Sequence, residues 1–232
     1  MIALSFALPE ESRDLARQVE GARRSGPAAL PVIAGKLRGR EVALVHSGMG
    51  MKSAGERVGS FLDAHAPGAL IAAGFGGGLA AGLKVGDMVV AQNFSDAGLL
   101  EATAKLPGER GNLITTREAI ESALQKKDLA RHTGAIVVDM ETAAIYRLCE
   151  ARKIPMLAAR AISDTVDEDL PVPMEIWFDM ARQRPRAMRL ILHLAGHPEK
   201  IERFAKFVRG VGRARRTLTD FLLAAIEVLP ER

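Results

Sequence analysis

The chain is poor in cysteine, and it contains no long apolar run. Cys149 is the single cysteine of the 232 residues, which excludes a disulfide within one chain and a zinc site made of cysteines. No stretch of about 18 apolar residues is present, so we expect no membrane-spanning helix. Residues 1–8 reach Pro9 without a basic leader, so we also expect no signal peptide. These absences predict a cytoplasmic protein.

Aromatic residues and clustered metal ligands are also scarce. Aromatic side chains make up 4% of the chain, which leaves little surface for stacking single-stranded bases. The five histidines are scattered, and the one close pair, His193 and His197, has no obvious carboxylate partner. Composition therefore disfavours nucleic acid as a partner, and we expect no metal.

Apolar residues at 48% and charged residues at 26% are typical of a globular chain, and no linker divides residues 1–232 into two domains. Short apolar runs alternate with helical patterns, which predicts an α/β fold with a central mixed sheet flanked by helices. From about residue 174 to residue 232 we expect a basic helical extension. The predicted strands are residues 2–7, 31–34, 40–46, 69–73, 88–91, 135–138 and 155–161, and the earlier predicted helices are residues 10–20, 53–64, 117–129 and 141–153.

Positive charge is concentrated near the C-terminus. From Arg182 to Arg216 there are 11 Lys and Arg residues against only Glu199 and Glu202, a net charge of +9, whereas the whole chain carries +4. Two apolar sets at helical spacing accompany this segment: Ile201, Phe204, Val208 and Val211, then Leu218, Phe221, Leu222 and Ala225. A basic amphipathic helix of this kind docks on an anionic membrane, or its apolar stripe packs on the sheet or on a second subunit.

A glycine-rich stretch, residues 73–81 (AGFGGGLAA), follows one of the predicted strands. Its spacing fits a loose dinucleotide-binding pattern, which requires a helix directly after the glycines. Only five residues, 79–83, precede the turn signal KVGD at residues 84–87. This length is too short for a crossover helix, so we expect a turn that allows close packing or ligand approach, and a dehydrogenase is disfavoured.

Three further motifs lie along the chain: HSGMG at residues 46–50, VVDMETAA at residues 137–144 and RAISD at residues 160–164. Together with the glycine-rich stretch they resemble the purine nucleoside phosphorylase family, most closely its 5′-methylthioadenosine/S-adenosylhomocysteine nucleosidase branch. The resemblance covers residues 2 to about 167. It implies an enzyme that cleaves the N-glycosidic bond of a nucleoside without a cofactor, and a homo-oligomer.

The resemblance assigns roles to individual residues. Asp164 matches the acid that shares a proton with purine N7, and Ser163 would orient it. Glu141 matches the carboxylate that binds the ribose hydroxyls, with Met140 packed on the sugar, and Glu11 matches the base that activates water. Two of these acids also have a structural interpretation, as a loop cap for Asp164 and a helix-terminus residue for Glu141.

Other site residues follow by position in the family. The purine is expected near residues 115–120, where Ala119 or Ile120 stands close to the place of the family's aromatic partner. Gly74 and Phe75 are expected to bind substrate, with Phe75 over the site or against an apolar 5′-substituent. Asp139 and Arg160 are expected to form an ion pair, which either positions the Met-Glu loop or only stabilises the fold.

The nucleophile is either water or phosphate. Family phosphorylases carry an arginine and a serine where this chain has AAGFG at residues 72–76, and Glu11 would repel a phosphate dianion. Water is therefore favoured. Backbone amides around Ser47, Gly48 and Gly50 still offer an anion nest, so phosphate as co-substrate stays the alternative.

The segment after Asp167 resembles the hopanoid-associated members of the family, which act on adenosylhopane, a lipid with an adenosine head. This resemblance implies peripheral contact with a membrane through the basic helices. The substrate is then either a small thio-nucleoside or a hopanoid. A nucleoside-binding protein without turnover is the remaining alternative, which the presence of Glu11, Glu141 and Asp164 disfavours.

Overall fold

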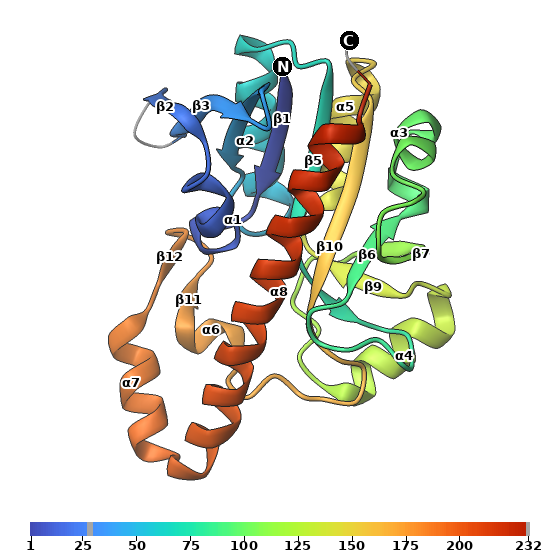
Figure 1. The fold of residues 1–232 in the computed structure, drawn as a ribbon. Coiled ribbons are helices and arrows are strands. Elements are labelled where there is room, and N and C mark those ends of the chain that lie inside the picture. The colour runs from blue at the N-terminus through green and yellow to red at the C-terminus, as the bar shows by residue number, and fades with distance from the viewer. Residues whose placement is uncertain (27–29, 231–232) are drawn as a thin grey trace.

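A ten-stranded mixed sheet organises the computed structural model, which describes residues 1–26 and 30–230 (Figure 1). The strand order is β2-β3-β4-β1-β5-β10-β6-β7, with β9 paired to the end of β5 and β8 paired to β9. The four central strands β4, β1, β5 and β10 are parallel, and antiparallel strands flank them. The strands of this sheet are β1 (Ile2–Phe6), β2 (Glu20–Ser25), β3 (Val32–Leu37), β4 (Arg40–His46), β5 (Ala69–Gly78), β6 (Met88–Ala91), β7 (Glu109–Gly111), β8 (Leu113–Thr115), β9 (Val137–Asp139) and β10 (Met156–Asp164).

Helices cover both faces of this sheet, which confirms the predicted α/β class. The helices are α1 (Pro9–Ala16), α2 (Met51–Ala64), α3 (Ala97–Ala102), α4 (Ala123–Thr133), α5 (Thr142–Ala151), α6 (Met174–Trp177), α7 (Ala187–Gly196) and α8 (Ile201–Val228), with short 3₁₀ turns at Gln92–Phe94 and Pro198–Lys200. A hairpin of β11 (Phe178–Asp179) and β12 (Arg184–Pro185) follows α6.

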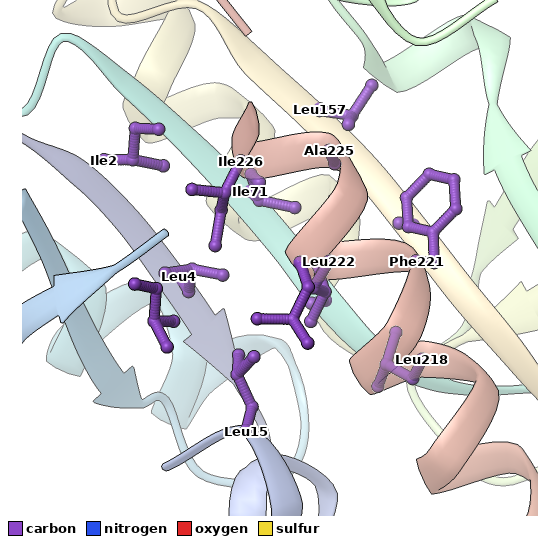
Figure 2. Close-up of a cluster of buried hydrophobic side chains, with 14 of the residues drawn as sticks. Ile2, Leu4, Leu15, Ile71, Leu157, Leu218, Phe221, Leu222, Ala225 and Ile226 are labelled. Atoms are coloured by element: carbon purple, nitrogen blue, oxygen red, sulfur yellow. The ribbon is translucent and has the colours of Figure 1, made fainter. Parts of the chain in front are cut away.

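Two apolar cores lie on opposite faces of the sheet. Along β5, Ile71 belongs to the core beneath α1 and α8, whereas Leu70 and Ala72 belong to the core beneath α2 and α5. This alternation follows from the two-residue period of a strand, and a strand that is buried on both faces is apolar throughout. Figure 2 shows the first core, in which Leu222 and Ile226 of α8 lie over the strands.

The long helix α8 changes environment along its length. Its second half is buried from Ala214 onward and includes Leu218, Phe221 and Leu222, as the sequence predicts. The apolar stripe predicted in the first half is not buried. Its residues Ile201 and Val208 are exposed and do not pack on the sheet. In Figure 1 this first half projects from the body of the molecule together with α7.

The glycine-rich stretch is a strand and not the predicted turn. β5 continues through Gly78, pairing with β10 on one side and with β9 on the other. Glycine permits this close pairing, because a Cβ at Gly76 would lie 2.7 Å from Cγ2 of Val137.

The predicted helix at residues 117–129 begins later than expected. α4 starts at Ala123, where the Ser122 side chain accepts from the Gln125 amide and Gln125 reaches back to the Ser122 amide. This capping box fixes the start of the helix and leaves residues 116–122 as a loop. The edge strand β2 was not predicted, since all six of its residues are exposed and show no apolar alternation.

Candidate active site

Glu11 joins helix α1 to the glycine-rich part of β5. Its carboxylate accepts hydrogen bonds from the amide of Phe75 at 2.9 Å and from the amide of Leu8 at 3.0 Å. The carboxylate lies against Gly74, where a Cβ would stand 2.8 Å from Oε1. Burial raises the pKa of Glu11, a shift that the two amide donors oppose. A carboxylate whose pKa is raised is a stronger base than an ordinary one, as a group that takes a proton from water needs to be.

Asp164 ends strand β10 and is held through both of its oxygens. The hydroxyl of Ser163 donates to Oδ1 at 2.6 Å, as the orienting role predicted for Ser163 requires. Oδ2 forms an ion pair with the ammonium group of Lys126, whose side chain is fully buried. Asp164 lies next to Gly77 of β5, since a Cβ there would be 3.4 Å from Oδ2.

Glu141 lies at the N-terminus of α5 and is buried, as is its neighbour Met140. Its Oε1 accepts a hydrogen bond of 2.6 Å from the amide of Gly50. Burial raises the pKa of Glu141 to about 8, and the negative charges of Asp139 and Glu11 add to the shift. The structure therefore brings the expected ribose ligand together with the loop after β4 and with the expected base.

Asp139 and Arg160 form the expected ion pair, buried beneath the start of α5. Arg160 contacts Asp139 Oδ2 through Nη2 at 2.6 Å and through Nε at 3.0 Å, and it also donates to the carbonyl of Ala72 at 2.6 Å. Asp139 in turn accepts from the amide of Thr142 at 3.1 Å and from the hydroxyl of Thr115 at 2.7 Å. This network fixes where α5 begins and hence where Glu141 points.

The backbone amides after β4 are already engaged. The amide of Ser47 donates to the carbonyl of Phe6 at 2.7 Å, that of Met49 donates to Oε1 of Gln183 at 2.7 Å, and that of Gly50 donates to Glu141. The hydroxyl of Ser47 donates to the carbonyl of Phe6 as well, at 3.1 Å. Gly48 has a φ of 74°, and a Cβ there would collide with the hydroxyl of Ser53. The predicted anion nest thus has few donors left for a ligand.

Two residues predicted to contact substrate, Phe75 and Ile120, pack partly on apolar clusters. The Phe75 side chain is partly buried against the core beneath α8. Ile120 is partly buried against Leu79, Ala135 and Val138. Their packing explains both positions without a ligand, and contact with substrate stays a prediction for each.

Strand β5 passes both of the expected catalytic carboxylates. Glu11 lies against Gly74 and Asp164 lies against Gly77, three residues further along the strand. At roughly 3.3 Å per residue the Cα atoms of these two glycines are about 10 Å apart. A cavity of about 240 Å³ adjoins Asp164 and Ser163, and its walls include Glu168 and Arg203, Arg209 and Arg213 of α8. Glu11 and Glu141 do not line this cavity.

With this geometry in place, comparison with known proteins decides the family. The sequence matches the Phosphorylase superfamily over residues 1–109 and 96–195. The chain belongs to the phosphorylase superfamily. Membership confirms the resemblance carried by the motifs and the expectation of a nucleoside-cleaving enzyme.

Solved nucleosidases share the superfamily fold at low identity. A 5′-methylthioadenosine/S-adenosylhomocysteine nucleosidase from Neisseria meningitidis, in complex with methylthio-immucillin-A, is 21% identical with a TM-score of 0.74 over 98% of this chain and 99% of that one. The S-adenosylhomocysteine nucleosidase from Streptococcus pyogenes, in complex with 5-methylthiotubericidin, is 19% identical with a TM-score of 0.75 over 99% and 97% of the two chains. These similarities confirm the nucleoside phosphorylase-like fold.

Two residues that hold parts of the candidate site were not predicted from the sequence. Lys126 is adjacent to Lys127 on a predicted polar helix, so nothing in the pattern indicated a buried ammonium. Gln183 lies in the basic segment, far along the chain from the loop it holds, and it has a φ of 50°. A contact of this range leaves no local signal in the sequence.

Within residues 1–26 and 30–230, no helix is long and apolar enough to cross a membrane. The same described residues contain no group of three or more His, Cys, Asp or Glu placed to hold a metal ion.

Proposed function

We propose that the chain is a hydrolase that cleaves the N-glycosidic bond of a 5′-modified adenosine and releases adenine. Asp164 protonates N7 of the leaving purine, and Glu141 binds the ribose hydroxyls, with Met140 against the sugar. Glu11 takes a proton from the attacking water. The transition state resembles a ribosyl cation, in which the site must stabilise positive charge on the sugar and negative charge on the base.

The observation that carries this proposal is that one stretch of β5 passes both acids, with Glu11 against Gly74 and Asp164 against Gly77. Glu141 lies close enough to Glu11 for the two charges to interact.

Water is the proposed nucleophile because the expected phosphate donors are occupied. Ser47, Met49 and Gly50 donate their amides to other groups of the chain, and the carboxylate of Glu11 adds negative charge. A phosphate dianion needs cations or free donors at this place. Phosphorolysis is the runner-up, and it requires the loop at residues 47–50 to release its amides.

Incubation with 5′-methylthioadenosine and with adenosine, with and without phosphate, tests the proposal. We expect adenine and free methylthioribose at a rate that does not depend on phosphate. Strict dependence on phosphate, with a ribose 1-phosphate as product, would establish phosphorolysis instead. Tight binding of 5′-methylthioadenosine without any release of adenine would identify a nucleoside-binding protein and contradict the proposal.

Helix α7 supports a second substrate, an adenosine attached to a lipid such as adenosylhopane. None of its residues is buried, and Met188, Ile191 and Leu192 are 68%, 59% and 65% exposed. These side chains belong to the segment from Arg182 to Arg216, which carries a net charge of +9. Exposed apolar groups beside cations are what an anionic bilayer binds. The enzyme would then act as a peripheral membrane protein.

Vesicles of phosphatidylcholine, with and without phosphatidylglycerol, test this surface. We expect sedimentation only with the anionic vesicles, and its loss in the Ile191→Ser/Leu192→Ser variant. Leu124→Ser is the matched control, because Leu124 is 68% exposed but lies on α4. Equal sedimentation of all three proteins would contradict the membrane role. A homo-oligomer that dissociates in the double variant, without vesicle binding, would assign α7 to the contact between subunits that the resemblance implies.

A further inference from the structure

The ammonium group of Lys126 is fully buried and has an acceptor for each of its protons. It donates to the carbonyl of Glu168 at 2.7 Å and to the carbonyl of Thr165 at 3.0 Å, and it pairs with Oδ2 of Asp164. Lysine is almost never fully buried unless its charge is paired, and an ammonium has three donors and no acceptor. All three donors therefore point into the segment that begins with Asp164.

Lys126 and Ser163 together fix the plane of the Asp164 carboxyl group. The Ser163 hydroxyl donates to Oδ1 at 2.6 Å, and the Lys126 ammonium contacts Oδ2. With one donor on each oxygen, the group cannot rotate without losing one of the two contacts. Each oxygen keeps a second lone pair, so the carboxyl group can still engage a base.

The neighbouring lysine already ties α4 to the loop after β10, so this structural role alone does not explain why Lys126 is buried against Asp164. Lys127 forms a pair of 2.7 Å with Asp167, and both side chains are exposed. Two consecutive lysines of α4 thus tie this helix to the same loop. Only Lys126 reaches Asp164.

We propose that Lys126 is a positioning residue for the leaving group, holding Asp164 in the orientation from which it protonates the departing base. This inference rests on the proposed function. As the bond between C1′ and N9 breaks, its electron pair goes to the purine and N7 takes the proton of Asp164. Asp164 takes up this proton from water as the nucleoside binds, while the ammonium of Lys126 keeps the carbonyls of Thr165 and Glu168. The carboxylate formed after the transfer regains the ion pair with Lys126 that the structure shows, a charge-assisted contact that stabilises it. Water forms the new bond to C1′ and gives its proton to Glu11.

The test compares two ribosides that differ in their need for an acid. Adenine release from 5′-methylthioadenosine requires protonation of the base, whereas 4-nitrophenyl β-D-ribofuranoside has a leaving group that departs without it. In Lys126→Met we expect kcat for adenine release to fall at least about 100-fold with KM within about threefold, as for loss of general acid catalysis. We expect kcat for the nitrophenyl riboside to stay within about threefold of the wild type. Lys127→Met is the matched control and should keep both rates.

Equal loss of both rates in a folded Lys126→Met protein would overturn the inference, since it would show a structural role alone. Unchanged adenine release would overturn it as well. If the methionine variant does not fold, Lys126→Arg keeps a cation at this place. In that variant we expect kcat for adenine release to fall relative to kcat for the nitrophenyl riboside, as in the methionine variant. An unchanged ratio of the two kcat values would count against the inference. A wild type that cleaves neither riboside would contradict the proposed function itself, which separates the two failures.

Discussion

The amide of Gly50 donates a hydrogen bond of 2.6 Å to Oε1 of Glu141, and this bond joins the loop after β4 to the N-terminus of α5. The two residues are 91 positions apart in the sequence. The bond leaves Oε2 of Glu141 and one lone pair of Oε1 for the ribose hydroxyls of the proposed substrate. A single backbone amide therefore joins the two parts of the chain that the proposed function places on the nucleophile and the sugar.

Replacing Glu141 by glutamine should change how stability depends on pH. Burial raises the pKa of Glu141 to about 8 from an ordinary value of 4.5, so the folded state binds this proton more tightly than the unfolded state. The contribution of this proton to the free energy of unfolding is fully present below pH 4.5 and is lost as the pH rises through about 8. Over that range the free energy of unfolding falls by at most about 1.4 kcal/mol per pH unit. Urea unfolding at about pH 5.5 and about pH 7.5 measures this slope.

In Glu141→Gln we expect a smaller decrease in the free energy of unfolding between these two pH values. Glu11 contributes a slope of the same sign, because burial raises its pKa too. Glu150→Gln is the control, since Glu150 is exposed on the same helix. A variant with the full slope of the wild type would show that Glu141 is ionised in the folded protein throughout this range.

Gly74→Ala should displace the carboxylate of Glu11. The added Cβ would lie 2.8 Å from Oε1 and 3.3 Å from Cδ, so the side chain or the strand must move. Misplacement of a reacting group by about 1 Å costs on the order of 100-fold in rate, and we expect a loss of kcat of about 10- to 100-fold. Steady-state adenine release measures it. In Gly55→Ala, where the Cβ would meet open space within α2, kcat should hold and unfolding should require about 0.5–1 kcal/mol more.

Asp139→Asn should destabilise the protein strongly. Arg160 would keep its charge in a buried position, with side-chain exposures in the present pair of only 3% and 1%. Breaking a buried ion pair by neutralising one partner costs about 3–5 kcal/mol. Chemical denaturation of Asp167→Asn provides the comparison, because its exposed pair with Lys127 is worth at most about 1 kcal/mol. Equal stability of the two variants would show that Arg160 finds another acceptor.

Asp164→Asn should lower kcat by about 100- to 10,000-fold, the range for loss of a general acid. Asparagine keeps the shape of the side chain and its contact with Ser163, but it carries no proton that it can give to N7. Adenine release under saturating substrate measures the change. The effect should be confined to kcat, so a rise of KM alone would mean that Asp164 binds the base without protonating it.

Much of the fold was predictable because its central strands are simple apolar runs. β1, β4, β6 and β10 lie where continuous hydrophobic residues indicate buried strands. β5 was predicted too short, since glycine usually interrupts a strand, and here a long-range neighbour makes glycine necessary. The pairing of Gly77 with Val138 of β9 is a tertiary contact that no local pattern contains.

The acidic residues of the candidate site were predictable, and their partners were not. Glu11, Glu141 and Asp164 belong to short motifs at the ends of strands or the starts of helices, so the resemblance predicts roles for them from local sequence. The side chain of Lys126 is buried because the loop after β10 folds over it, an event set by packing far from its own position. Gln183 reaches the loop at Met49 only because the β11–β12 hairpin turns back.

The divided environment of α8 has an evolutionary consequence. Its inner half, from Ala214 onward, is constrained by the core, whereas exposed positions such as Ile201 and Val208 contribute little to folding. Replacements at the outer positions leave the packed sheet untouched, so this end of the helix is free to diverge. Arg203 and Arg213 of the same helix also wall the cavity beside Asp164, so replacing them would change the charge around that carboxyl group while the scaffold stays the same.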